Sequence, residues 1–429
     1  MWTFDGNLND FYGIFNAGPD NGRTATYVYP GYTGYGGALS LGLHGTSQSV
    51  SIATFLSIWH VSFTLEAWIY PTAFSWTYGG SPDNALFGQC QSQSTDRCLH
   101  IILRSQRIYF GFYGDDLQGN IAFQANQWYH VAYAYDQSTR QQYTYVNGVI
   151  FELLHDGQAG NFTIGMSTQI NSPNNYFQGY FDQMSIVAYC KTAAQILDDA
   201  THVVYYKFDT TPGMTIDSGP LYINGISNGV SLTSSPSKVN QSLYFPSGTS
   251  YYQFQGLTYF GHSGWSYSIS LWIYPLSSSG GTIVHASGGY GTDGVGNTGW
   301  CLPMLGFSSS GALYAQTTSS TSTLIVLTGP TVTLNSWTYV TITYSTTNGL
   351  RLYTDSTLQS SSTTAFTFIS SGSPNTITLG NGLSGASSIY CPQGSITSAQ
   401  YQGYIDSFSL YSRELTTANI ATLYTTPQP

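Results

Sequence analysis

The chain has 429 residues, of which 7% are charged and 16% are aromatic, and its formal net charge is −10. Its 10 basic residues are outnumbered by 20 acidic ones and are scattered singly, which argues against nucleic acid and anionic membranes as partners. No apolar run reaches the ~20 residues of a membrane span. The length predicts two or three packed domains, and the high content of glycine, tyrosine, serine and threonine favours strands and turns over helices.

An internal repeat with a spacing of about 200 residues divides the chain. The openings agree, because Trp2–Asp5 matches Tyr206–Asp209. We therefore expect one domain in residues 1–203, a second in residues 204–429, and almost no linker. Three further pairs of segments match in the same order: Phe63–Pro71 with Tyr267–Pro275, Gln127–Tyr135 with Ser336–Tyr344, and Phe177–Asp182 with Tyr401–Asp406.

The local pattern within each repeat is one strand after another. Residues 131–135 alternate between large and small side chains, which is the period of a strand that packs on one face. Asn147 and Gly148 have the residue types of a tight hairpin turn. Short helices are expected only from Thr192 to His202 and from Thr416 to Tyr424, each with a threonine as N-cap. The predicted fold class is all-β, with two tandem antiparallel β-sandwiches.

The matched segments resemble the laminin-G-like, or concanavalin A-like, jelly-roll family. In that family an F-T-x-E-x-W-x-Y strand, a W-Y-H-V-A strand and a G-x-x-D-x-x-x-x-Y strand recur in this order. The resemblance covers nearly the whole chain twice and implies two antiparallel sheets packed face to face in each repeat, one of them curved to leave a concave face. It does not fix the function, because the fold hosts lectins, adhesion modules, glycan hydrolases and structural spacers.

The carboxylates argue against an enzyme. Glucanases of the family set two glutamates on one strand, one as proton donor and one to attack or to activate water. This chain has three glutamates, Glu66, Glu152 and Glu414, and the second repeat carries Ser270 in place of Glu66. The histidines show no zinc-binding spacing, and no nucleophile elbow, phosphate loop or dinucleotide fingerprint is present. We therefore predict no catalytic activity.

The resemblance implies calcium as a candidate ligand, although no cofactor is required. Family members often bind calcium at the rim of the sandwich through aspartates, which here are Asp5 with Asp182 and Asp209 with Asp406. Calcium needs six to eight oxygen ligands. The alternative is that these aspartates accept backbone N–H groups of adjacent turns.

Loop residues are the candidates for ligand binding. Exposed aromatic rings with a few polar groups suit sugars, and Trp76, Tyr78 and Trp300 lie on expected loops. The alternative is that these rings cap the ends of the core. Asp115 and Asp116 form an adjacent acidic pair in a glycine-rich loop, which suits either a ligand site or a solvated turn.

The cysteines predict two disulfides. Cys90 and Cys98 flank a short polar loop between two expected strands, and Cys301 occupies the position of Cys98 in the second repeat, with Cys391 as its expected partner. Cys190 is then left over, as a buried thiol or an intermolecular link.

Acceptor sequons at Asn161 and Asn240 add candidate glycosylation sites. Together with the expected disulfides they favour an extracellular or secreted protein.

Two functions from different classes fit this sequence. The first is a structural or adhesive protein that self-associates, since low surface charge and tyrosine-rich surfaces suit contacts between copies, and head-to-tail contacts would give a filament. The second is a carbohydrate-binding, lectin-like or cell-adhesion module. The sequence analysis prefers the first, with other copies of the chain or extracellular glycans as the expected partners.

Overall fold

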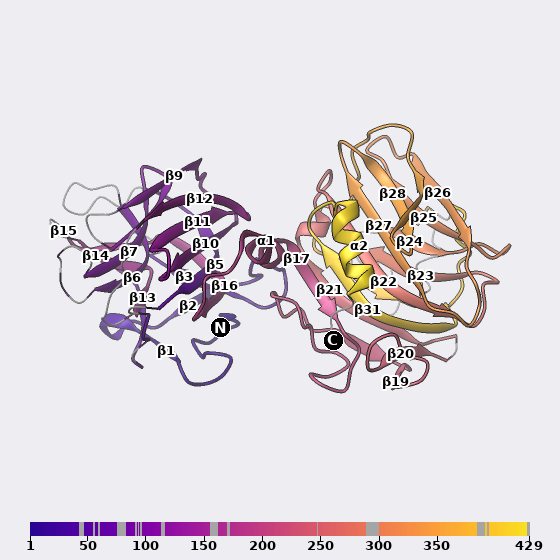
Figure 1. The fold of residues 1–429 in the computed structure, drawn as a ribbon, viewed down its shortest axis with the longest axis horizontal. Helices are drawn as coiled ribbons and strands as arrows, with labels where there is room; N and C mark the ends of the chain where they lie inside the picture. The colour runs from indigo at the N-terminus through magenta and orange to yellow at the C-terminus, as the bar shows by residue number, and fades with distance from the viewer. Residues whose placement is uncertain are drawn as a thin grey trace. The chain divides into compact units, whose positions relative to one another are not determined.

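The chain forms two compact units in the computed structural model (Figure 1). Unit 1 contains Met1–Tyr32 and Gly36–Ala200, and unit 2 contains Thr33–Tyr35 and Thr201–Pro429. The structure describes residues 1–42, 47–54, 56–58, 61–74, 83–90, 92, 94, 97–112, 116–154, 162–169, 172–246, 248–288, 300–383, 391–392 and 394–426.

Two seven-stranded sheets make up most of the described part of unit 1. In spatial order, the strands of the first sheet are β1 (Ala17–Pro19), β4 (Val50–Ile52), β13 (Phe162–Ile164), β6 (Asp83–Cys90), β7 (Cys98–Arg104), β8 (Arg107–Gly111) and β9 (Leu117–Ala122). The strands of the second, which we call the β5 sheet, are β12 (Val149–Leu154), β11 (Gln141–Val146), β10 (Tyr129–Asp136), β5 (Phe63–Pro71), β16 (Gly179–Val187), β3 (Ala38–Leu41) and β2 (Thr26–Val28). A separate pair joins β14 (Met166–Gln169) to β15 (Ser172–Tyr176).

Unit 2 repeats this arrangement across its described residues. The strands of its first sheet are β18 (Ile226–Asn228), β21 (Tyr251–Leu257), β30 (Asn375–Leu379), β23 (Gly281–Ser287), β24 (Cys301–Phe307), β25 (Ala312–Thr318) and β26 (Leu324–Thr331). The strands of the second, the β22 sheet, are β19 (Ser231–Thr233), β20 (Ser242–Phe245), β31 (Gly403–Tyr411), β22 (Tyr267–Pro275), β27 (Thr338–Ser345), β28 (Gly349–Thr354) and β29 (Thr357–Ser361), and β17 (His202–Tyr206) pairs with β31.

The two main sheets therefore have the same strand order in both units, apart from the additional strand β17 of unit 2. In the β5 sheet the central strand β5 lies between β10 and β16, and in the β22 sheet β22 lies between β27 and β31. All of these pairs are antiparallel. The all-β, two-sandwich prediction is confirmed, and the sequence repeat corresponds to a repeat of the whole sheet order.

Alternation along β5 explains which face carries the core. Phe63, Leu65 and Ile69 belong to the apolar core of unit 1 and are almost fully buried. Because successive side chains of a strand point to opposite faces, the even-numbered residues of β5 point to the other face, which we call the outer face. The chain thereby presents Trp68 and Tyr70 outside the core of unit 1.

A short helix covers part of each outer face. In unit 1, Ile196 of α1 (Ala193–Thr201) packs with Ala132, Ala134 and Tyr145 of the β5 sheet. In unit 2, Ile420 of α2 (Thr417–Thr425) packs in a cluster with Trp272, Tyr339 and Tyr353, and Figure 1 shows α2 lying across β22 and β27. In the residues that the structure describes, no helix is long and apolar enough to cross a membrane.

The predicted turn and helix caps are present. Asn147 and Gly148 both have positive φ, 51° and 80°, and join β11 to β12, which is the conformation of the tight hairpin that their residue types favour. Thr192 accepts a hydrogen bond from the Gln195 N–H, and Thr416 forms a capping box with Asn419. Both helices thus begin where the threonines predict.

Candidate functional site

Three aromatic side chains lie together on the outer face of the β5 sheet. Tyr70 on β5 lies opposite Tyr180 on β16, and Trp128 immediately precedes β10, the other neighbour of β5. The Tyr70 ring stacks on that of Tyr180 with centroids 5.3 Å apart, and its centroid is also 5.3 Å from that of Trp128. All three side chains are partly exposed. We call them the unit 1 platform.

The same three positions form a platform in unit 2. Tyr274 on β22 lies opposite Tyr404 on β31, and Trp337 immediately precedes β27. The Tyr274 ring centroid is 5.4 Å from that of Trp337 and 5.6 Å from that of Tyr404. Tyr244 on β20 adds a fourth ring, stacked on Tyr404 with centroids 4.7 Å apart. We call these four residues the unit 2 platform, and all four are partly exposed.

These clusters have the chemistry of a sugar-binding surface. Each combines exposed apolar ring area with phenolic hydroxyls that donate and accept hydrogen bonds. Burial raises the pKa of Tyr70, and Tyr180 adds to the rise. Burial also raises the pKa of Tyr404, with Tyr244 and Tyr274 contributing. The phenols of both residues are therefore neutral donors at physiological pH.

Each platform continues along its central strand to a tryptophan that a loop residue covers. In unit 1, the Tyr32 ring stacks on Trp68 with centroids 3.5 Å apart, and it also contacts Trp128, with centroids 5.8 Å apart. In unit 2, the Nζ atom of Lys238 lies 3.8 Å from the ring centroid of Trp272. At the end of the platform, the loop of unit 1 thus contributes a tyrosine and the loop of unit 2 contributes a lysine.

The aspartates proposed for calcium hold these loops by their main chain. In unit 1, Asp182 accepts the backbone N–H groups of Tyr32 and Gln183 at 2.7 and 2.8 Å, and Asp5 accepts that of Gly37 at 2.8 Å. Burial raises the pKa of Asp182 well above its usual value, and the neighbouring Asp5 adds to the rise. The two carboxyl groups are therefore close enough to interact.

Unit 2 repeats this arrangement. Asp406 accepts the Lys238 N–H at 2.9 Å, and Asp209 accepts the Gln241 N–H at 2.9 Å. Burial raises the pKa of Asp406 to about 7, with Asp209 adding to it. These contacts match the alternative interpretation, in which the aspartates accept backbone N–H groups of turns. Calcium binding at either pair stays a prediction.

Glu66 lies on the outer face of β5 in a buried charged cluster. The Nζ atom of Lys191 donates to Glu66 and, at 2.8 Å, to Asp199, while His130 Nε2 lies 3.8 Å from Glu66 Oε1. Burial raises the pKa of Glu66 to about 7, and burial together with the Lys191 charge lowers the pKa of His130 to about 3. Lys191 holds Glu66 in place, which supports its interpretation as a structural carboxylate.

Asp116 belongs to a second polar cluster in unit 1. It lies 3.0 Å from His100 Nε2 and accepts a hydrogen bond from the Tyr109 hydroxyl at 3.0 Å. Burial acts to raise the pKa of Asp116, but the contacts with His100 and Tyr109 outweigh it and the pKa is lowered. Asp116 therefore anchors the start of β9 to β7 and β8.

Of the remaining predicted ligand and glycosylation residues, the structure describes Trp300 and Asn240. Trp300 is half-buried, and its ring lies edge-on to Phe368 with centroids 6.4 Å apart. Asn240 is exposed, and its side-chain amide donates to Asp209 at 3.1 Å. Four predicted residues lie outside the part of the chain that the structure describes: Trp76, Tyr78, Asp115 and Asn161.

The structure contains both disulfides that the sequence predicts. Cys90 is bonded to Cys98 across the ends of β6 and β7, and Cys301 is bonded to Cys391. Cys190 is half-buried with a free thiol, whose pKa is raised by burial and by Asp136.

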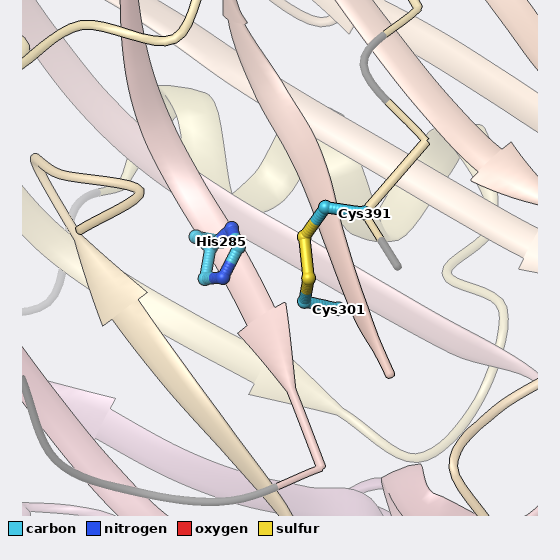
Figure 2. Close-up of side chains that lie close together, drawn as sticks. All are labelled: His285, Cys301 and Cys391. Carbon is cyan, nitrogen blue, oxygen red and sulfur yellow. A yellow bond between two sulfur atoms is a disulfide. The ribbon is translucent and has the colours of Figure 1, made fainter. Parts of the chain in front are cut away.

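A histidine lies beside the second disulfide (Figure 2). Ligand-type atoms of His285, Cys301 and Cys391 lie within 4.8 Å of one another, and in the described ranges no other group of three such side chains meets this condition. Metal binding by cysteine requires the thiolate, and both sulfur atoms are in the disulfide. The disulfide of this buried cluster therefore ties β24 to the segment that carries Cys391.

Two segments of the chain, residues 44–197 and 246–421, match the model of the concanavalin A-like lectin/glucanases superfamily. Together they cover most of both units. The chain belongs to this superfamily, with two tandem copies of its jelly roll.

Solved structures with a similar fold include domain 4 of AbnA, a GH43 extracellular arabinanase from Geobacillus stearothermophilus, in complex with arabinotriose. It is 20% identical with a TM-score of 0.36, and the match covers 46% of this chain and 95% of that domain. The receptor binding domain of botulinum neurotoxin D is 16% identical with a TM-score of 0.37, and 53% of each chain is covered. The binding domain of Paraclostridial Mosquitocidal Protein 1 is 14% identical, also with a TM-score of 0.37, and 53% of this chain and 52% of that one are covered.

This chain thus spans about half the length of those two binding domains. No curated protein sequence matches it.

Both platforms lie on the sheets, whereas the ligand residues predicted from the sequence lie on expected loops. A signal was nevertheless present, since the three matched segments carry an aromatic residue at the platform positions in both repeats. These pairs are Tyr70 with Tyr274, Trp128 with Trp337, and Tyr180 with Tyr404.

Proposed function

We propose that the chain is a non-catalytic, extracellular carbohydrate-binding protein in which each unit binds a sugar on its platform. The observation that carries this proposal is the repetition of a partly exposed Tyr-Trp-Tyr cluster at equivalent positions of the two units. A side chain that only filled space would be buried, and aromatic rings left open to water in a cluster favour a ligand with an apolar face.

Sugars suit this surface because a pyranose ring has an apolar face rimmed by hydroxyl groups. The face stacks on aromatic rings, and the hydroxyl groups exchange hydrogen bonds with water for hydrogen bonds with neighbouring phenols. Trp128 and Trp337 are the largest rings of their platforms, and each contacts the tyrosine at its centre. We therefore expect these two tryptophans to contribute most to affinity.

Two further observations support an extracellular location and a non-catalytic function. Two disulfides are typical of chains that fold in an oxidising compartment. Glu66 has Lys191 as its charge partner and is not paired with a second glutamate on its strand, as a glucanase mechanism requires.

The test is binding of the full chain to a glycan array, followed by calorimetric titration of the sugars that bind. Trp128→Ala and Trp337→Ala should each remove about half of the binding sites, and the double variant should bind no sugar. Trp265→Ala is the matched control, because Trp265 is 48% exposed and precedes β22 at the end away from Tyr274. Sugar binding that survives in the double variant would overturn the platform assignment.

Self-association, which the sequence analysis preferred, stays a second proposal. Phe11, Tyr12 and Ile14 are 59%, 72% and 62% exposed on one loop, and Asp10 accepts the Ile14 N–H at 3.4 Å. Three apolar side chains that project from an organised loop favour a protein contact. Negative-stain imaging across a concentration series tests it: regular polymers that disappear in Tyr12→Ser would support it, and monomers at every concentration would contradict it.

A further inference from the structure

Tyr32 of unit 1 and Lys238 of unit 2 occupy equivalent places. The backbone N–H of Tyr32 donates to Asp182, and that of Lys238 donates to Asp406. These two aspartates match in the sequence repeat and lie on the matching strands β16 and β31. The loop before β3 and the loop before β20 are thus held by the same contact.

The side chains at this place differ in charge. Tyr32 covers Trp68 with a neutral ring, whereas Lys238 places an ammonium group 3.8 Å from the ring centroid of Trp272. Lys238 is exposed, and it forms no ion pair with any carboxylate in the described part of the chain. A cation over an aromatic ring is attracted to the ring face, and the exposed ammonium group remains accessible to a ligand.

The ammonium group borders the unit 2 platform. Trp272 and Tyr274 are two residues apart on β22 and point to the same face, so their backbones are ~6.6 Å apart. That distance is close to the width of one sugar ring. A sugar stacked on Tyr274 therefore places its substituents toward Trp272 and Lys238.

The local charge outweighs the net charge of the chain. The chain carries a formal −10, which alone would disfavour an anionic ligand. However, exposed charges more than ~8 Å away are largely screened at physiological ionic strength. Lys238 places an exposed positive charge next to Trp272 on this face.

We propose, on the basis of the carbohydrate-binding function above, that the unit 2 platform binds sugars that carry a carboxylate or a sulfate, whereas the unit 1 platform binds neutral sugars. The ligand would stack on Tyr274 and Trp337 and accept a charge-assisted hydrogen bond from Lys238. Tyr32 offers the neutral sugar of unit 1 only ring area and a hydroxyl group.

The experiment uses the full chain with Trp128→Ala, which leaves the unit 2 platform as the only one. The probes are tetragalacturonic acid, its fully methyl-esterified form, and a sulfated galactose tetrasaccharide, so the first two share one sugar backbone and the methyl groups of the ester remove the charge. The quantity measured is the ratio of the affinity for a charged probe to that for the neutral ester. Lys238→Gln should lower this ratio by about tenfold or more, and Lys238→Arg should retain it.

The outcomes separate this inference from the proposed function. An unchanged ratio in Lys238→Gln overturns the inference, while loss of sugar binding in Trp337→Ala still supports the platform. Absence of binding to all three probes in the Trp128→Ala chain also overturns it. Binding of only the galacturonate or only the sulfated probe supports it and names the anionic group. Equal melting temperatures of the variants show that the fold is intact.

Discussion

The Tyr32 ring lies almost parallel to the Trp68 ring, at an interplanar angle of 11° and a centroid distance of 3.5 Å. This contact gives the first prediction, a transfer of specificity. Tyr32→Lys in a chain that also carries Trp337→Ala should make the unit 1 platform accept charged sugars. We expect its affinity ratio for galacturonate over the methyl ester to rise by about tenfold.

The reason is that Asp182 holds residue 32 by its backbone N–H, so the loop should keep its place when the side chain changes. Calorimetric titration with the same probes measures the effect. Tyr32→Phe is the control, and its affinity ratio for galacturonate over the methyl ester should equal that of the parent chain. A Tyr32→Lys chain with the parent ratio would show that a cation at this place does not reach the ligand.

A second prediction concerns pH and the stability of unit 2. The pKa of Asp406 is about 7 in the folded state, compared with 3.8 for an ordinary aspartate. Between these values the folded state retains a proton that the unfolded state has lost, so the free energy of unfolding should rise as the pH falls from 7 toward 4. One such proton changes it by at most about 1.4 kcal/mol per pH unit.

Asp406→Asn should flatten this dependence, because the amide oxygen can still accept the Lys238 N–H but no proton is exchanged. Denaturant unfolding at pH 5 and pH 7.5 measures the change in the free energy of unfolding between these pH values. Asp355→Asn, at an exposed aspartate of unit 2, should keep the slope of the parent chain. Equal slopes in all three chains would contradict the role of Asp406.

A third prediction compares the two disulfides. The Cys301–Cys391 bond joins residues 90 apart, and the Cys90–Cys98 bond joins residues 8 apart. Because a longer closed loop restricts the unfolded chain more, removing them should cost about 4.6 and about 2.5 kcal/mol, respectively. Denaturant unfolding of Cys301→Ser/Cys391→Ser and of Cys90→Ser/Cys98→Ser tests this order. Cys190→Ser should stay close to the parent chain, and a reversed order would mean that contacts in the folded state dominate.

A fourth prediction concerns the capping of α2. Thr416 accepts the Asn419 N–H at 3.2 Å, and its own backbone N–H donates to the Asn419 side chain. Thr416→Ala should lower the free energy of unfolding of unit 2 by about 1 kcal/mol. Thr422→Ala, at an exposed position of the same helix, should change it by less than about 0.5 kcal/mol. Equal effects of the two substitutions would argue against the cap.

The sequence predicted the features that depend on neighbouring residues. The hairpin at Asn147 and Gly148 and the cap at Thr416 require only a few adjacent side chains. The Cys90–Cys98 bond follows from spacing across one hairpin. The repeat supplied the fold class because whole strands recur in order.

The side-chain contacts between neighbouring strands that are distant in the sequence were not predicted. The pairing of Tyr180 with Tyr70 brings together residues from β16 and β5, and a period-2 pattern in either strand does not identify its neighbour. For the same reason the sequence did not identify the N–H of Tyr32, 150 residues away, as a group that Asp182 binds.

The hydrogen bonds from the loop backbone to Asp182 and Asp406 have an evolutionary consequence. Because each carboxyl group contacts the peptide backbone, it tolerates any side chain at the loop tip except proline, which has no N–H to donate. Duplicated copies could therefore exchange a phenol for an ammonium group by one amino-acid substitution that keeps the backbone contact. Tandem arrays built from this module could diversify their ligands at one interchangeable position while selection preserves the scaffold.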